Sequence, residues 1–169
     1  MNILKNDQFP KGLCQPNGVE ELKVDTSFLK FLLSFCPNYR VTDLINSKKL
    51  AQNLKIKSLY IKDERERFNL GSFKATGATF AIAKMAYNLL GNKNDITKKS
   101  LAESLKTYTF VTASAGNHGI SMAVGARLFG SKAVVFLSKT VPKSFSRKLE
   151  SYGARVVFSG KNYEENGYI

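Results

Sequence analysis

Two short segments of this sequence carry residues whose types and spacing could do chemistry together. The first, Phe68–Ala78 (FNLGSFKATGA), places the amine of Lys74 beside the ring of Phe73 and among small residues, at the predicted start of a helix. The second, Thr112–Gly119 (TASAGNHG), is a polar turn that follows an apolar run and opens another predicted helix. An amine can condense with a carbonyl compound, and backbone N–H groups at a helix start can bind an anion.

Lys74 also has an ordinary interpretation, that of a solvated lysine in the first turn of a helix. Lysine is unfavourable there because the N-terminal end of the helix dipole is positive, so a reason other than helix stability is needed. Its neighbours Gly71, Ser72, Ala75 and Gly77 are small, which leaves room for a flat ring. These features favour a reactive amine.

The turn Ser114–His118 likewise has two interpretations. It is either an ordinary strand-to-helix turn capped by Ser or Asn, or a loop whose backbone N–H groups hold a substrate carboxylate. His118 is the single histidine of the chain. It could act as a general base or support the loop, and the sequence leaves both roles open.

The elements that must position these residues alternate between strands and helices from residue 58 onward. Predicted strands are Ser58–Lys62, Thr109–Thr112, Ala133–Leu137 and Arg155–Phe158. Four helices are predicted between these strands. The first runs from a Ser72 cap to Gly91, the second begins at Thr97, the third ends at Gly130, and the fourth begins near Pro142 and ends before Gly153. This alternation predicts an α/β fold with an open parallel sheet of about four strands and flanking helices. The continuously apolar run at 133–137 predicts a strand covered on both faces.

Residues 1–57 are less regular and form a predicted N-terminal segment, separate from the α/β domain predicted over residues 58–169. The helical pattern is weak over Val19–Leu33 and stronger over Leu44–Leu54.

The run Ser72-Phe73-Lys74 with Gly77-Ala78, followed by Ser114–His118, resembles the fold-type II pyridoxal-phosphate enzymes. This family, with the tryptophan synthase beta-like fold, includes threonine and serine dehydratases, cysteine synthase and diaminopropionate ammonia-lyase. The resemblance implies that Lys74 binds pyridoxal 5'-phosphate covalently and shuttles the substrate α-proton. It implies that Phe73 and Asn117 contact the cofactor. The substrate carboxylate would lie on the loop of Ser114, Ala115, Gly116, Asn117 and His118.

The resemblance covers most of residues 36–163 and implies the N-terminal part of a longer enzyme. The charged stretch at 62–68 looks most like the ammonia-lyase branch, whereas Ala115 stands where that branch has an aspartate and resembles the dehydratases. The implied activity is β-eliminating deamination of a small amino acid. The family's phosphate-binding loop lies further downstream, so the expected truncated chain would have little activity alone. The alternatives are a non-catalytic remnant or a split-gene half that needs a partner. The expected partners are a small amino-acid substrate and either further copies of this chain in a homo-oligomer or a complementing C-terminal half.

The charge and composition restrict other classes of function. The net charge is +13, but the 26 Lys and Arg are spread without long runs, so a solvated surface is favoured over a specific nucleic-acid site. No apolar stretch has membrane-spanning length and no secretory signal is visible, which predicts no membrane partner and a cytoplasmic location. No cluster of residues has metal-ligand spacing, so no metal is predicted.

Overall fold

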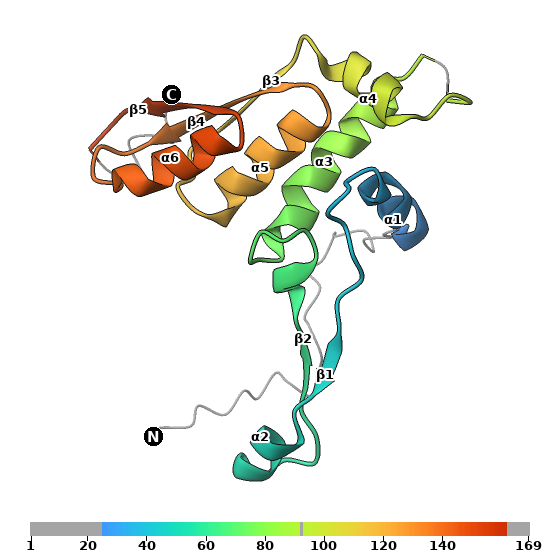
Figure 1. Cartoon of the computed structure of the whole chain (residues 1–169), viewed down its shortest axis with the longest axis vertical. Helices are drawn as coiled ribbons and strands as arrows, with labels where there is room; N and C mark the ends of the chain where they lie inside the picture. Colours follow the sequence, from blue (N-terminus) through green and yellow to red (C-terminus); the bar gives the residue numbers. More distant parts are fainter. Residues whose placement is uncertain (1–24, 92, 162–169) are drawn as a thin grey trace, which may run out of the picture.

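The structure, a computed structural model, describes residues 25–91 and 93–161, which form a body and a projecting arm (Figure 1). The body holds helices α1 (Thr26–Ser34), α3 (Lys74–Leu89), α4 (Lys98–Leu105), α5 (Asn117–Leu128) and α6 (Lys143–Ser151), and strands β3 (Thr109–Thr112), β4 (Lys132–Leu137) and β5 (Ala154–Phe158). The arm, residues 41–62, holds β1 (Leu44–Asn46), α2 (Lys48–Asn53) and β2 (Tyr60–Lys62). The short 3-10 helix η2 (Glu64–Glu66) follows the arm.

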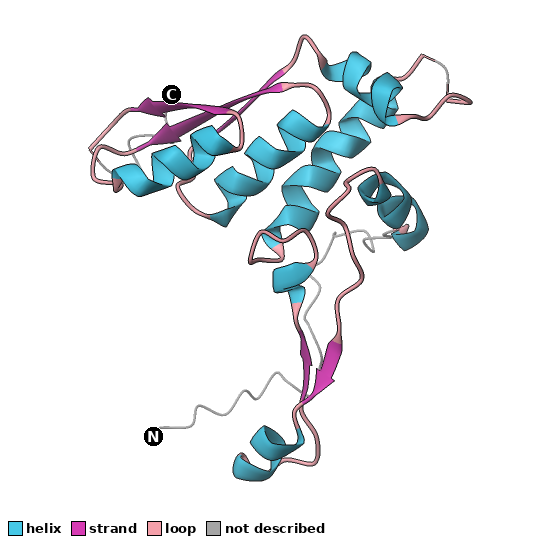
Figure 2. Cartoon of the chain, in the orientation of Figure 1, coloured by secondary structure: helices cyan, strands magenta, loops and turns pink. Residues whose placement is uncertain are grey.

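Strands β3, β4 and β5 form a parallel sheet in that order, with Val111 beside Val134 and Val135 beside Val156. When strands are added in one direction, right-handed crossovers place the connecting helices on the same side. Helices α5 and α6 accordingly lie on one side of the sheet (Figure 2). The predicted α/β class with a parallel sheet and flanking helices is confirmed.

The fourth predicted parallel strand lies outside this sheet. The segment Ser58–Lys62 gives β2, which pairs antiparallel with β1 in the arm. Its prediction as one strand of the parallel sheet was therefore wrong, although a strand does form there. A three-residue strand carries no local signal that distinguishes a partner in the arm from a partner in the main sheet.

The apolar run of β4 predicted a strand covered on both faces, but the two faces are not covered equally. Ala133 and Leu137 are buried in the cluster that includes α5, whereas Val134 and Phe136 on the opposite face are half-buried. The cause is the strand order, because both crossover helices of the three-stranded sheet lie on the same side.

Helix boundaries follow local signals in most places. The predicted helix from Thr97 is confirmed: the Thr97 side chain accepts from the Ser100 N–H at 3.1 Å, and Ser100 Oγ accepts from the Thr97 N–H at 3.0 Å. Helix α5 is followed by Gly130 at φ 70°. The predicted Ser72 cap was wrong, because the N-cap of α3 is Phe73, which makes no side-chain capping bond.

Helices α3 and α5 pack closely at the centre of the body. The buried residues of α3 are Ala75, Thr79, Ile82, Ala83 and Ala86. On α5, a Cβ atom at Gly125 would lie 3.0 Å from Thr79 Cα and 3.1 Å from Ile82 Cδ1. Only glycine leaves enough space for this crossing of the two helices.

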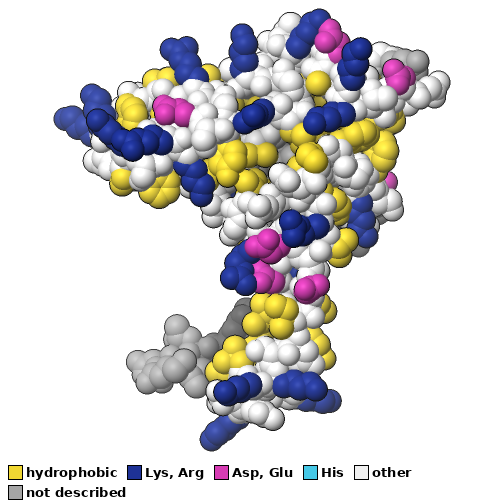
Figure 3. Space-filling model, in the orientation of Figure 1, with side chains coloured by type: hydrophobic (Ala, Val, Ile, Leu, Met, Phe, Trp, Pro, Cys, Tyr) yellow, Lys and Arg dark blue, Asp and Glu magenta, His cyan; other side chains and the backbone are white. Residues whose placement is uncertain are grey.

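The arm differs from the helix predicted over Leu44–Leu54. The first three residues of the predicted helix instead form β1, because they pair with β2 across the arm. Only Lys48–Asn53 is helical. Ile45 lies opposite Ile61 in this ribbon. Figure 3 shows hydrophobic side chains on the arm surface and lysines at its far end.

Within the predicted N-terminal segment, helix α1 packs on the body. The helical pattern over Val19–Leu33 overlaps it, although residues before 25 lie outside the described part of the chain. Asp25 caps the helix by accepting from the N–H groups of Ser27 and Phe28 at 2.9 and 3.0 Å. Leu32 is fully buried in the same cluster as the α3–α5 contact. No helix in the described ranges is long and apolar enough to cross a membrane.

The close contact at Gly125 generates a stability prediction. A Gly125→Ala substitution should lower the free energy of unfolding by about 1–3 kcal/mol, because the new methyl group meets the backbone of α3. The matched control is Gly77→Ala on α3, where an added Cβ has no atom within 4 Å and should be neutral or stabilising by up to about 1 kcal/mol. Urea unfolding measures both, and equal losses would contradict the packing argument.

Candidate active site

Lys74 is the first residue of α3 and its side chain is exposed. Phe73, immediately before it, is 65% exposed. Space is open on both sides, because a Cβ added at Gly71 or Gly77 would find no atom within 4 Å. The backbone on both sides of Lys74 is therefore uncrowded, which is compatible with the planar group expected from the small neighbouring residues.

The predicted carboxylate loop connects β3 to α5. Ser114 and Ala115 are half-buried, whereas Gly116, Asn117 and His118 are exposed. The loop folds tightly onto the first turn of α5, since a Cβ at residue 119 would lie 2.1 Å from the Ser114 carbonyl oxygen. This role of Gly119 was not predicted, although a glycine in the first turn of a helix is a usable signal.

The first turn of α5 offers backbone hydrogen-bond donors. The N-cap residue Gly116 has no side chain to cap the helix, and the turn contains no acidic residue. The first donor with a partner is the Ile120 N–H, which bonds to the Gly116 carbonyl at 3.3 Å. Within the described part of the chain, the N–H groups of residues 117–119 meet no acceptor. Such a helix start suits an anionic group.

A hydrogen bond between α3 and α5 brings the two predicted segments together. Ser121 Oγ donates to the carbonyl oxygen of Lys74 at 2.9 Å. Ser121 lies about one helical turn after Asn117, so both helices begin at the same end of the packed pair. Ser121 was not predicted as part of the site, because a serine within an apolar helix gives no sign of a partner 47 residues away.

A charged clamp, made of Thr42, Lys62, Glu64 and Arg67, lies at the base of the arm. Glu64 accepts from Thr42 Oγ1 at 2.8 Å and from both Nε and a terminal nitrogen of Arg67, the latter at 2.6 Å. Lys62 Nζ donates to the Thr42 carbonyl. The Arg67 hydrogen bond is the main cause that lowers the pKa of Glu64 to about 2. The clamp thus ties the arm to the chain that leads to Lys74.

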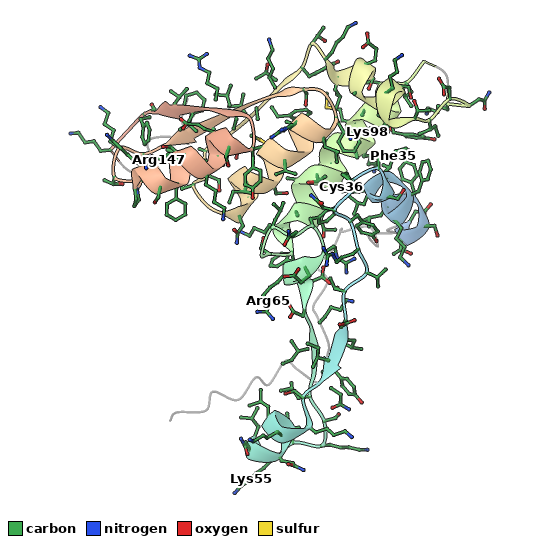
Figure 4. The ribbon with its side chains drawn as sticks, in the orientation of Figure 1. Phe35, Cys36, Lys55, Arg65, Lys98 and Arg147 are labelled. Atoms are coloured by element: carbon green, nitrogen blue, oxygen red, sulfur yellow. The ribbon has the colours of Figure 1, made fainter. Side chains whose placement is uncertain are left out.

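The turn between this clamp and Lys74 has a defined backbone. Hydrogen bonds from Arg65, at the base of the arm in Figure 4, lower the pKa of Asp63 to about 2. Asn69 and Gly71 have φ of 56° and 73°, left-handed values that reverse the chain before α3. The turn therefore sets the direction in which α3 and its first residue leave the arm.

Two cavities lie near these elements. One of about 520 Å³ is lined by Lys62, Arg65, Ser72 and Phe73 among others, and so adjoins the residue before Lys74. Another of about 410 Å³, against Cys36, contains none of the predicted site residues. In the described ranges, no three His, Cys, Asp or Glu side chains are placed to hold a metal ion.

Comparison with known proteins gives a consistent result. The family model described as "Pyridoxal-phosphate dependent enzyme" matches residues 36–169. Diaminopropionate ammonia-lyase of Salmonella typhimurium is 36% identical over 137 residues, covering 76% of this chain and 33% of that protein. Catabolic L-threonine dehydratase of Staphylococcus aureus is 33% identical over 132 residues, covering 78% and 33%.

The solved structures agree. The crystal structure of Escherichia coli diaminopropionate ammonia lyase in complex with D-serine superposes with a TM-score of 0.72 at 26% identity, covering 83% of this chain and 36% of that one. The chain therefore spans about a third of the length of the curated relatives that it matches.

The clamp generates a pH prediction. Because the pKa of Glu64 falls from 4.5 to about 2 on folding, its carboxylate stabilises the fold fully above about pH 4.5, and this contribution is lost as pH falls toward 2. Glu64→Gln should cost about 1–3 kcal/mol of unfolding free energy near neutral pH, and the difference from the parent chain should shrink below pH 4.5.

Urea unfolding at about pH 6 and pH 3 measures this difference. The control is Glu66→Gln, an exposed neighbour whose carboxylate accepts no hydrogen bond from the described residues. A Glu64→Gln penalty that does not change between the two pH values would refute the linkage.

Proposed function

The chain belongs to the family of pyridoxal-phosphate-dependent enzymes, and on that basis we propose that it serves β-eliminating deamination of a small amino acid. The observation that carries the proposal is the shared end of α3 and α5, where the exposed amine of Lys74 and the unpaired N–H groups of residues 117–119 lie. An amine for a carbonyl carbon and donors for a carboxylate are the two groups that this reaction class requires. Similarity to an ammonia-lyase and a dehydratase supports the same class.

The residues at this end fit the reactive part of pyridoxal phosphate. Lys74 would hold its aldehyde carbon, and the open space beside Gly71 and Gly77 admits a planar ring. The exposed amide of Asn117 would donate to the phenolic oxygen of the ring, and Phe73 would lie beside it. When bound, the cofactor supplies an electron sink for the charge that develops at the substrate α-carbon.

The chain's own groups would then orient the substrate and move its proton. The backbone N–H groups of residues 117–119 would bind the substrate carboxylate, together with the loop from Ser114. The amine of Lys74, displaced by the substrate amine, would accept the α-proton before the β-substituent leaves. His118 is exposed and hydrogen-bonds to none of the described residues, so we give the proton transfer to Lys74. The elimination product would hydrolyse to a 2-oxo acid and ammonia.

In a second candidate role, this chain is one portion of an enzyme and acts only together with a partner polypeptide. It is favoured by the one-third share of the relatives' length that this chain spans. Residues 1–57 would then be a segment that packs on a larger domain, and residues 58–169 an incomplete α/β domain. Completion could come from a homo-oligomer or from a complementing polypeptide. The cytoplasmic location stays a prediction.

The proposed role of Lys74 predicts selective labelling. With pyridoxal phosphate and borohydride, Lys74 should be labelled more than other lysines, because space is open beside the neighbouring glycines and unpaired N–H donors lie at the same end of the α3–α5 pair. Peptide mapping measures the distribution of label. Lys74→Ala should remove the dominant peptide, whereas Lys84→Ala, an exposed lysine on the same helix, should not. Label spread evenly over the exposed lysines would argue against the site.

Because the chain spans about a third of the length of its curated relatives, we expect the chain alone to be a weak catalyst. Release of 2-oxo acid and ammonia from diaminopropionate, serine or threonine should be at least about a hundredfold slower than with a full-length relative, because an incompletely held cofactor is poorly oriented. The assay uses purified chain with added cofactor, and Lys74→Ala as the background. Turnover at the rate of the relative, abolished by Lys74→Ala, would show that the chain needs no completion.

A further inference from the structure

The cavity of about 410 Å³ against Cys36 lies along the last two turns of α5. That helix contributes Val124, Arg127 and Leu128 to its wall, whereas the loop of the candidate site lies at Asn117, the start of the same helix. At about 1.5 Å per residue, a rise of about 15 Å separates Asn117 from Arg127. The cavity is therefore separate from the candidate site, and its volume is within the range of about 300–1,000 Å³ that holds small organic molecules.

The inner wall of this cavity is apolar and firmly supported. Phe68 and Cys36, which line it, are only 3% and 6% exposed. Leu70, Val124 and Leu128 also line it and are half-buried. Phe68 and Leu70 belong to the turn that precedes α3, so the packing of this turn near α5 forms the cavity. The apolar body of a ligand would contact these side chains.

The open side of the cavity carries positive charge. Two of its ten lining residues, Lys98 and Arg127, are exposed cations, and none of the ten is a carboxylate. Arg127 donates from one terminal nitrogen to the Ser151 carbonyl at 3.3 Å, which holds the guanidinium beside the end of α6. Its other N–H groups, and the ammonium of Lys98 near Cys36 in Figure 4, meet no acceptor in the described part of the chain. Such cations form strong, charge-assisted hydrogen bonds with an anion.

We propose that this cavity binds a small organic anion with an aromatic body. Arg127 and Lys98 hold the anionic group at the open side, and Phe68 and Leu128 contact the ring. Tyr152, half-buried in the same wall, adds a second aromatic side chain and a hydroxyl group. The proposal goes beyond the proposed function and does not rest on it.

The mixed wall determines which simpler ligands should bind poorly. An inorganic anion such as sulfate would pair with the two cations but leave the apolar wall without a contact. A neutral aromatic compound would cover the apolar wall but leave both cations without a partner. The ligand therefore needs the ring and the charge in one molecule.

The test uses the full chain and naphthoate, an aromatic carboxylate without an aldehyde, which cannot form an imine with Lys74. Titration calorimetry at about 0.15 M salt, where the Debye length is about 8 Å, limits attraction by the net charge alone. Naphthoate should bind at least about tenfold more tightly than the neutral isostere naphthamide, and than sulfate. Backbone amide shifts in NMR spectra should include those of Val124 and Leu128 and leave residues 117–119 unchanged.

Charge-removing variants test the two cations. Arg127→Gln and Lys98→Gln should each weaken naphthoate binding at least about fivefold and leave naphthamide binding unchanged. The matched control is Lys148→Gln, which removes the same charge from an exposed lysine of α6 outside the cavity and should leave the affinity unchanged. Unfolding curves show that the variants are folded, and Lys98→Gln breaks no hydrogen bond among the described residues.

Three outcomes would overturn the proposal. They are naphthoate binding no tighter than that of naphthamide or sulfate, equal losses for Lys148→Gln and Arg127→Gln, and amide shifts confined to residues 117–119 or to the arm. Lys74→Ala should not change the affinity for naphthoate. Absence of selective labelling at Lys74 with naphthoate binding intact would therefore count against the proposed function alone, and the reverse result against the cavity site alone.

Discussion

The close crossing of α3 and α5 is the contact on which the candidate site depends. Gly125 allows the helices to approach, and Ser121 adds a hydrogen bond to the carbonyl of Lys74. Without this contact the lysine and the Asn117 loop would belong to separate parts of the chain. The packing of two ordinary helices thus converts two local sequence patterns into one site.

Much of the body could be predicted from the sequence because its signals are local. The strand Thr109–Thr112 follows from its apolar β-branched and aromatic residues, and the Thr97 capping box and Gly130 mark helix ends directly. The arm could be predicted only in part: β2 lies within the predicted strand Ser58–Lys62 and α2 within the predicted helix Leu44–Leu54, whereas β1 exists only through its pairing with β2. Ser121 and Gly125 matter through partners on α3 that no local pattern reveals.

The arm is joined to the body by charged side chains rather than by apolar packing. Glu64 and Arg67 lie beside Thr42 at the point where the arm meets the body, and the same stretch continues through the left-handed Asn69 and Gly71 to Lys74. The direction of the arm and the direction of α3 are consequently set by one short segment.

The order of strands also has a consequence for how the chain folds. Each strand of the main sheet pairs with the strand next to it in sequence, so β3, α5, β4, α6 and β5 can assemble through contacts of short sequence separation. The contact between Lys74 and Ser121 closes a much longer loop, of 47 residues, and loop closure of that length costs more entropy. We expect the sheet with its two helices to form first and α3 to dock afterwards, so that the Asn117 loop is in place before the lysine reaches it.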